Sequence, residues 1–212
     1  MNLGLKETNF LGKGQKLNFT TSFSNTRNTY DISFTEPYFN NKKLALTGSL
    51  YSNLTDPSSV NYEIEDLGLG FVIEFPLSAS TYLSTRYSLL TSQVKADSNA
   101  TLYERLLAGT DTISTIGYTL IYDMRNSRYK PSRGFLFKVD QDIAGLGGTS
   151  YYIKNRLDYN IYNKLSDRLI GAFKLQVGGL NGYNSEYAPL SSNFKLGGKR
   201  LRGFKSGKVG PR

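Results

Sequence analysis

The 212-residue chain contains no cysteine, no histidine and no tryptophan. Without Cys there is no thiol nucleophile and no disulfide framework, and without Cys and His there is no zinc site of the usual kind. A Ser-His-Asp triad is excluded because its base is missing. No apolar run approaches the roughly 18 residues of a transmembrane helix. We therefore expect no enzyme, no cofactor and no metal site.

Aromatic residues, glycine and positive charge are plentiful. The chain has 16 Tyr, 12 Phe and 21 Gly, and its 26 Lys and Arg exceed its 17 Asp and Glu by nine. Aromatic residues favour strands, and glycine favours tight turns. The mean hydropathy of −0.38 is negative. That value is compatible with a membrane β-barrel, because the strands of such barrels alternate apolar and polar residues.

Alternation with a period of two dominates the chain. In one segment Leu67, Leu69 and Phe71 point to one side, while Gly68 and Gly70 point to the other. Such alternation predicts strands with one apolar and one polar face. Helical periodicity is weak and confined to residues 100–108. The predicted strands lie within residues 17–24, 30–35, 44–51, 67–75, 82–89, 116–122, 135–142, 153–161 and 169–177, with a shorter one at 3–8.

The predicted connectors are of two kinds. Those at residues 9–14, 37–42 and 76–80 are compact, whereas those at 55–60 and 93–111 are longer and polar. Short turns at one end and long loops at the other are typical of an up-and-down meander. No linker divides the chain, so we expect a single domain.

The alternation leaves open what the apolar faces contact. In a soluble sandwich they would meet in a core, and in an outer-membrane barrel they would face lipid. The single long meander favours the barrel. Its polar faces would then line a lumen and carry mid-strand charges, which are most simply read as ion pairs of the wall: Arg86, Lys138, Asp140, Lys154, Arg156, Asp158 and Lys174.

The C-terminal stretch carries the most specific motif. Residues 194–212 read FKLGGKRLRGFKSGKVGPR. They resemble the FxxGG…[VL]RGF…GP signature of BamA-type assembly factors, in the bacterial surface antigen family. Three earlier turns resemble the same family in the expected order, at residues 9–14 (NFLGKG), 34–39 (FTEPYF) and 123–134 (DMRN followed by PSRG).

The resemblance implies a role for the C-terminal motif. In this family the stretch belongs to the sixth extracellular loop, which folds back into the lumen, and the arginine matching Arg202 contacts acidic residues on late strands. Guanidinium suits a bidentate contact with a carboxylate, and glycine lets the backbone turn without a Cβ clash. The expected loop residues are Gly197, Gly198, Leu201, Arg202, Gly203, Phe204, Gly210 and Pro211.

The resemblance also implies the fold and the function. The expected fold is all-β, an antiparallel up-and-down transmembrane β-barrel that is incomplete, with about ten of the family's sixteen strands. Residues 1–212 would run from the second to the eleventh strand and into the sixth loop. Neither POTRA domains nor a signal peptide are expected in the chain. The parent protein would fold and insert client β-barrel proteins into the bacterial outer membrane, in contact with its lipid and with accessory lipoproteins.

Other functions compete with this interpretation. A two-partner secretion transporter or a TamA-like barrel would belong to the same family. The basic C-terminal tail would suit a soluble β-protein that binds polyanions such as nucleic acid. A passive porin-like channel would lack the loop motif. Because four motifs follow in the family's order, we expect no nucleic-acid partner.

Overall fold

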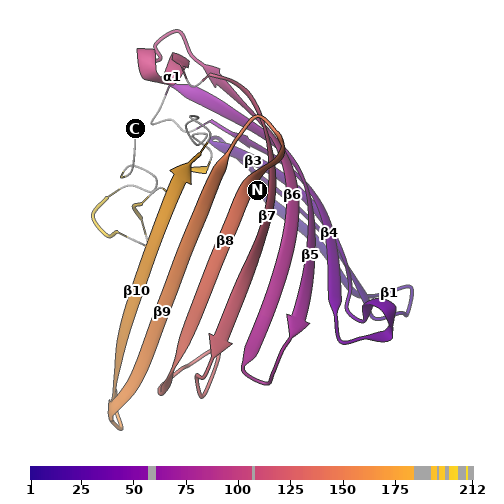
Figure 1. Ribbon diagram of the computed structural model, residues 1–212, viewed down its shortest axis with the longest axis vertical. Coiled ribbons are helices and arrows are strands. Elements are labelled where there is room, and N and C mark those ends of the chain that lie inside the picture. Colours follow the sequence, from indigo (N-terminus) through magenta and orange to yellow (C-terminus); the bar gives the residue numbers. More distant parts are fainter. Residues whose placement is uncertain are drawn as a thin grey trace.

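One antiparallel sheet contains every strand among the residues that the computed structural model describes, which are 1–56, 61–106, 108–183, 192–194, 196–198, 201–204 and 209. Consecutive strands pair along the sequence, so the first and the last strand form the two edges of the sheet among the described residues. Figure 1 shows the sheet as a curved, open surface. The strands are β1 (Asn2–Phe10), β2 (Gln15–Ser24), β3 (Arg27–Glu36), β4 (Ala45–Thr55), β5 (Tyr62–Pro76), β6 (Thr81–Ala96), β7 (Gly109–Asp123), β8 (Gly134–Gly148), β9 (Tyr152–Ser166) and β10 (Leu169–Gly182).

The strand register gathers the apolar side chains on one face. Phe34 pairs with Gly48, and Gly48 pairs with Phe71, so these residues of β3, β4 and β5 form one row across the sheet. Directly opposed residues share a face, and side chains alternate along each strand. The apolar alternates of all strands therefore lie together. Each of the ten predicted segments is confirmed as a strand, and β6 extends further than predicted, to Ala96.

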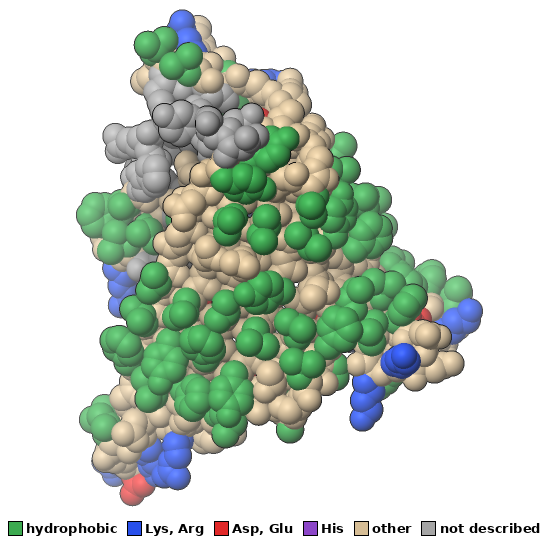
Figure 2. Space-filling model, in the orientation of Figure 1, with side chains coloured by type: hydrophobic (Ala, Val, Ile, Leu, Met, Phe, Trp, Pro, Cys, Tyr) green, Lys and Arg blue, Asp and Glu red, His purple; other side chains and the backbone are tan. Residues whose placement is uncertain are grey.

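The apolar face is the exposed, convex one. Ile116 and Phe173 remain 49% and 58% accessible, and Figure 2 shows hydrophobic side chains spread over the face turned to the viewer. The small buried clusters lie on the opposite face, as with Tyr62, Ile64 and Val94. No second sheet packs on the first among the described residues. The soluble sandwich is therefore not the fold.

The connectors define two ends of the sheet. Those after β1, β3, β5, β7 and β9 form the lower end, and those after β2, β4, β6 and β8 form the upper end (Figure 1). The predicted division into a short-turn end and a long-loop end is only partly right. Residues 124–133 form a long connector at the lower end, while β8 and β9 are joined by only residues 149–151 at the upper end.

The upper connector between β6 and β7 contains a short helix, α1 (Leu102–Leu106), inside the segment of weak helical periodicity. Thr101 and Glu104 cap it reciprocally. The Glu104 N–H donates to Thr101 Oγ1 at 3.3 Å, and the Thr101 N–H donates to Glu104 Oε2 at 2.8 Å. The Thr101 N–H and the Thr101 hydroxyl both donate to the Glu104 carboxylate, and they lower the pKa of that carboxyl. Neither α1 nor the 3₁₀ turn η1 (Phe39–Asn41) has the length and hydropathy of a membrane-spanning helix.

The connector between β7 and β8, residues 124–133, contains most of the third turn motif. Arg125 donates from Nε to Asp123 Oδ1 and from Nη2 to Asp123 Oδ2, both at 2.8 Å. The Asn126 side chain accepts from the N–H of Ser132 at 3.0 Å. Gly134 has φ +97° and comes so close to Met124 that a Cβ would lie 2.1 Å from its carbonyl oxygen. The motif residues therefore hold a turn together.

Candidate site on the concave wall

A charged cluster centred on Arg86 occupies the concave wall of β6, β7 and β8. Arg86 Nε donates to Asp142 Oδ1 at 2.8 Å, and Nη1 donates to Thr119 Oγ1 at 2.7 Å. Its Nη2 forms an ion pair with Asp140, and Lys138 Nζ lies 3.3 Å from the same carboxylate. One guanidinium thus connects three strands through a fork of donors.

Gly117 makes this bridge possible. It lies on β7, paired with Arg86 on one side and Asp142 on the other. A Cβ at this position would lie 2.2 Å from Asp142 Oδ1 and 3.1 Å from Arg86 Nε. Its backbone φ is not in the left-handed region, so the requirement here is space. Glycine in a strand often marks such a close approach.

Charges of opposite sign continue along the wall onto β9. In the register of β8 and β9, Asp140 lies opposite Arg156 and Lys138 lies opposite Asp158. Arg156 Nε lies 3.0 Å from Asp158 Oδ2 on its own strand. The prediction that the mid-strand charges form wall ion pairs is therefore confirmed for most of them. These pairs are only partly buried, so each stabilises the sheet modestly.

Residues 192–194 contact this wall. Lys154 Nζ donates to the Ser192 carbonyl at 2.8 Å and lies 4.8 Å from the centre of the Phe194 ring. Ser192 is only 7% exposed. The Phe194 ring lies over Gly178 of β10, where a Cβ would be 2.8 Å from Cζ. Residues 192–194 are therefore anchored on the wall, beside a hollow of about 430 Å³ that Arg86, Asp140 and Asp142 also line.

The predicted loop motif forms a local turn. Gly197, Gly198 and Gly203 have φ values of +129°, +61° and +90°, the region that glycine tolerates. The Gly198 N–H donates to the Phe204 carbonyl at 2.8 Å. Leu196 pairs with Val209 by two backbone hydrogen bonds. These φ values agree with a turn built on glycine, and the role of these residues in a loop inside the lumen stays a prediction.

The remaining motif residues are less constrained. Leu201 and Phe204 are 36% and 55% exposed. The Arg202 side chain is exposed and forms no ion pair with an acidic residue of the described part of the chain. The resemblance assigns that contact to later strands, so it stays a prediction. Gly210 and Pro211 lie outside the described residues.

Sequence reasoning identified the charges but missed how they are used. Phe194 was visible as the first residue of the motif, but nothing local links it to Gly178 or to Lys154. These contacts depend on the strand register, which places Gly178 opposite Arg156 and Gly117 opposite Arg86. No group of three or more potential metal ligands occurs among the described residues. The charge of Lys154 and the packing of Phe194 on Gly178 together position residues 192–194 on the wall.

Comparison with known proteins agrees with this architecture. Residues 9–212 match the Omp85 superfamily domain. The mouse "Sorting and assembly machinery component 50 homolog" is 27% identical over 100% of the chain, which covers 45% of that protein. The "Outer membrane protein assembly factor BamA" of Nitratidesulfovibrio vulgaris is 25% identical over 98% of the chain and 26% of that protein. The chain thus spans less than half the length of these relatives.

A solved structure has the same fold. The crystal structure of BamA from Haemophilus ducreyi lacking POTRA domains 1–3 superposes with a TM-score of 0.89 at 20% identity. The match covers 99% of this chain and 44% of that one. The curved, open ten-stranded sheet is therefore the architecture of part of a BamA barrel.

Proposed function

The chain belongs to the Omp85 superfamily, and we propose that it is part of the barrel of an assembly factor that folds and inserts β-barrel proteins into an outer membrane. The observation that carries this is the division of the sheet into an apolar convex face and a charged concave wall on which residues 192–194 are anchored. A lipid-facing exterior and a polar interior are the pattern of transmembrane barrels. The names of the mouse and bacterial relatives support the assembly role.

The chain corresponds to only part of the whole protein. We propose that its ten strands are the second to the eleventh of a sixteen-stranded barrel and that residues 194–212 begin the sixth loop. The 44% coverage of the solved BamA chain agrees with the chain being part of a longer protein, and the order of the four motifs supports the placement. The POTRA domains, the contacts with client barrels and the contacts with lipoproteins would belong to the whole protein.

We propose the bacterial outer membrane as the location, supported by the match to one bacterial BamA sequence and one bacterial BamA structure. Relatives in animals such as mouse and human make an outer membrane of a eukaryotic cell the alternative. Fractionation of the source cell distinguishes the two.

A soluble polyanion-binding protein fits poorly, because the large apolar side chains of the convex face would be exposed to water. The proposed role requires no catalytic residue.

Arg202 is the residue whose replacement tests the function. In the full-length protein, Arg202→Ala should slow assembly of client barrels and lower their amount in the membrane, because the loop would lose its guanidinium contact with the wall. Arg202→Lys should recover only part of the activity, since lysine lacks the bidentate fork. The measurements are outer-membrane protein levels and the heat-dependent electrophoretic mobility of the folded barrel.

Arg168→Ala provides the matched control. Arg168 lies in the turn between β9 and β10, and its backbone N–H, rather than its side chain, makes its one hydrogen bond among the described residues. This variant should behave as the unaltered protein does. Normal client assembly in Arg202→Ala would contradict the proposed role of the loop.

A further inference from the structure

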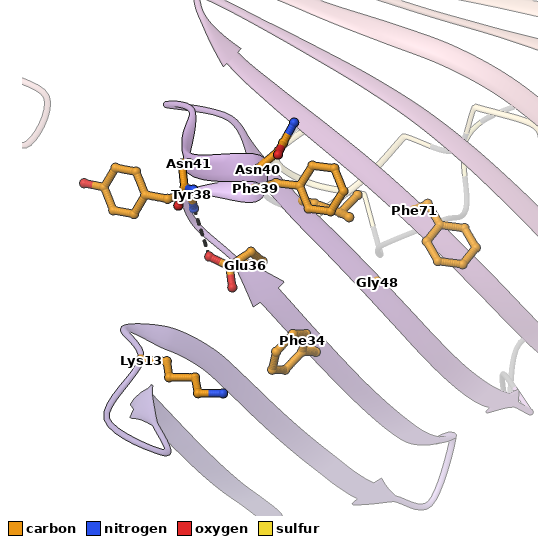
Figure 3. A pocket seen from close by; sticks show the side chains of 10 residues that line it. Lys13, Phe34, Glu36, Tyr38, Phe39, Asn40, Asn41, Gly48 and Phe71 are labelled. Carbon is orange, nitrogen blue, oxygen red and sulfur yellow. Dashed lines mark hydrogen bonds between the residues drawn. The ribbon is translucent and has the colours of Figure 1, made fainter.

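A hollow of about 750 Å³ opens on the convex face at the lower end of the sheet (Figure 3). Its floor is Gly48 of β4, and Phe34 and Phe71 stand on the neighbouring strands. Its rim is formed by Lys13, in the turn between β1 and β2, and by η1. The assembly role uses none of these residues.

The strand register creates a slot in this hollow. Gly48 is paired with Phe34 on one side and with Phe71 on the other. Neighbouring strands lie about 4.8 Å apart, so Phe34 and Phe71 stand two strands apart with no side chain on the strand between them. A Cβ at position 48 would be 3.6 Å from the Phe71 ring. The Phe34 ring is steadied by edge contact with Phe10, at 6.3 Å between centroids.

The rim supplies one cation that can bind a ligand. The Glu36 carboxylate is occupied, because Oε2 accepts from Gln15 Nε2 at 2.8 Å and Oε1 accepts from the Tyr38 N–H at 3.1 Å. It attracts Lys13 only at longer range. Among the described residues, Lys13 forms no side-chain hydrogen bond and no ion pair. Figure 3 shows Lys13 in the turn between β1 and β2, at the edge of the hollow.

We propose that this hollow binds a phospholipid with an anionic headgroup. One acyl chain lies in the slot over Gly48, between Phe34 and Phe71, and the phosphate lies beside the Lys13 ammonium. The slot is two residues from the end of β3 at Glu36, so the apolar floor and the charged rim are adjacent, as the tail and headgroup of a lipid are. This inference requires the convex face to lie in a bilayer, as the proposed function does, but it does not require assembly activity.

Tryptophan fluorescence tests the proposal, because the chain has no Trp of its own. In the full-length protein, Phe39→Trp places a reporter at the rim, and the unaltered protein gives the background. Trp is well tolerated at a membrane interface. The reporter is quenched by brominated phosphatidylglycerol diluted into phosphatidylcholine vesicles. One lysine contributes about 1 kcal/mol near a surface, so we expect about fivefold enrichment of the anionic lipid over its mole fraction.

Three further variants decide the outcome. Lys13→Gln, made with the reporter, should reduce quenching to the level set by the mole fraction, and Gly48→Leu should do so by filling the slot. Lys130→Gln is the matched control, since Lys130 is an exposed lysine of another lower-end connector, and it should retain the enrichment. Folding is followed by heat-dependent mobility. Equal quenching with and without Lys13, in folded protein, would overturn the lipid site while leaving the assembly role intact. Folded protein that does not enter vesicles would contradict both.

Discussion

At the scale of single residues, three glycines shape the concave wall by leaving room for side chains. Gly68 lies under Tyr51, where a Cβ would be 2.1 Å from the ring, and Gly117 and Gly178 make room for Arg86 and Phe194. None of the three has a left-handed φ. Their role is therefore to admit a neighbour, and each is paired with a bulky residue or contacted by one. This is a different use of glycine from that in the turns.

Gly117→Ala should destabilise the barrel. The added methyl would collide with the Asp142 carboxylate and with the Gln141 backbone carbonyl, 2.6 Å away, so the Arg86 bridge would have to move. Overpacking of this kind costs about 1–3 kcal/mol of unfolding free energy. Urea unfolding of the full-length protein in lipid vesicles measures the change. Gly179→Ala is the control, since a Cβ there meets nothing within 4 Å, and an equal loss in both variants would contradict the steric explanation.

Alternation along the strands predicts only part of the charged wall. The sequence was sufficient to place Arg86, Asp140 and Asp142 on one polar face, because side-chain direction depends only on position along a strand. It was not sufficient to predict that Arg86 reaches across Gly117 to β8. That contact depends on the register of three strands, which is fixed by pairing between segments far apart in the chain.

At the scale of elements, residues 192–194 are held by β9 and β10 together. Lys154 donates to the Ser192 carbonyl, and the Phe194 ring packs against Gly178. The strands were predicted because alternation is local. The strand ends were not, since hydrogen bonding to a neighbour extends them, as where Val94 pairs with Gly109 across the α1 connector.

Thiol labelling tests the anchoring of residues 192–194. The chain has no Cys, so Asn193→Cys introduces a single thiol into this part of the protein. We expect slow labelling when Gly178 is present and labelling faster by about tenfold when Gly178→Val displaces Phe194, which corresponds to about 1.4 kcal/mol of lost docking. Gly179→Val, one residue along the strand, should leave the rate unchanged. Identical rates in both valine variants would show that the ring does not hold the segment.

At the scale of the whole molecule, polarity is reversed relative to a water-soluble domain. Val177 on the convex face is 54% exposed, whereas the buried clusters lie on the concave side. The family's fold could be predicted because four ordered motifs identify it. The lengths of the individual connectors could not, since turns such as residues 124–133 are held by hydrogen bonds between their own ends.

Adjacent positions on β10 test this reversal. In the full-length protein, Val177→Arg should cost about 2–4 kcal/mol of unfolding free energy in a bilayer, because the charge would face hydrocarbon. Gln176→Arg places the same side chain on the concave face, beside Asp158, and should be nearly neutral. Denaturant unfolding in vesicles measures both. A greater cost for Gln176→Arg would contradict the assignment of the faces.

The sequential pairing of the strands has a mechanical consequence. Since each strand of the described sheet is hydrogen-bonded to its neighbours in chain order, a force applied to a terminus of the full-length protein should load one strand or hairpin at a time while the others stay paired. When the protein is pulled from a membrane by an atomic force microscope, we expect a sawtooth in which each peak releases one strand or one hairpin. Extraction in a single rupture would mean that the ribbon of strands resists tension as one body.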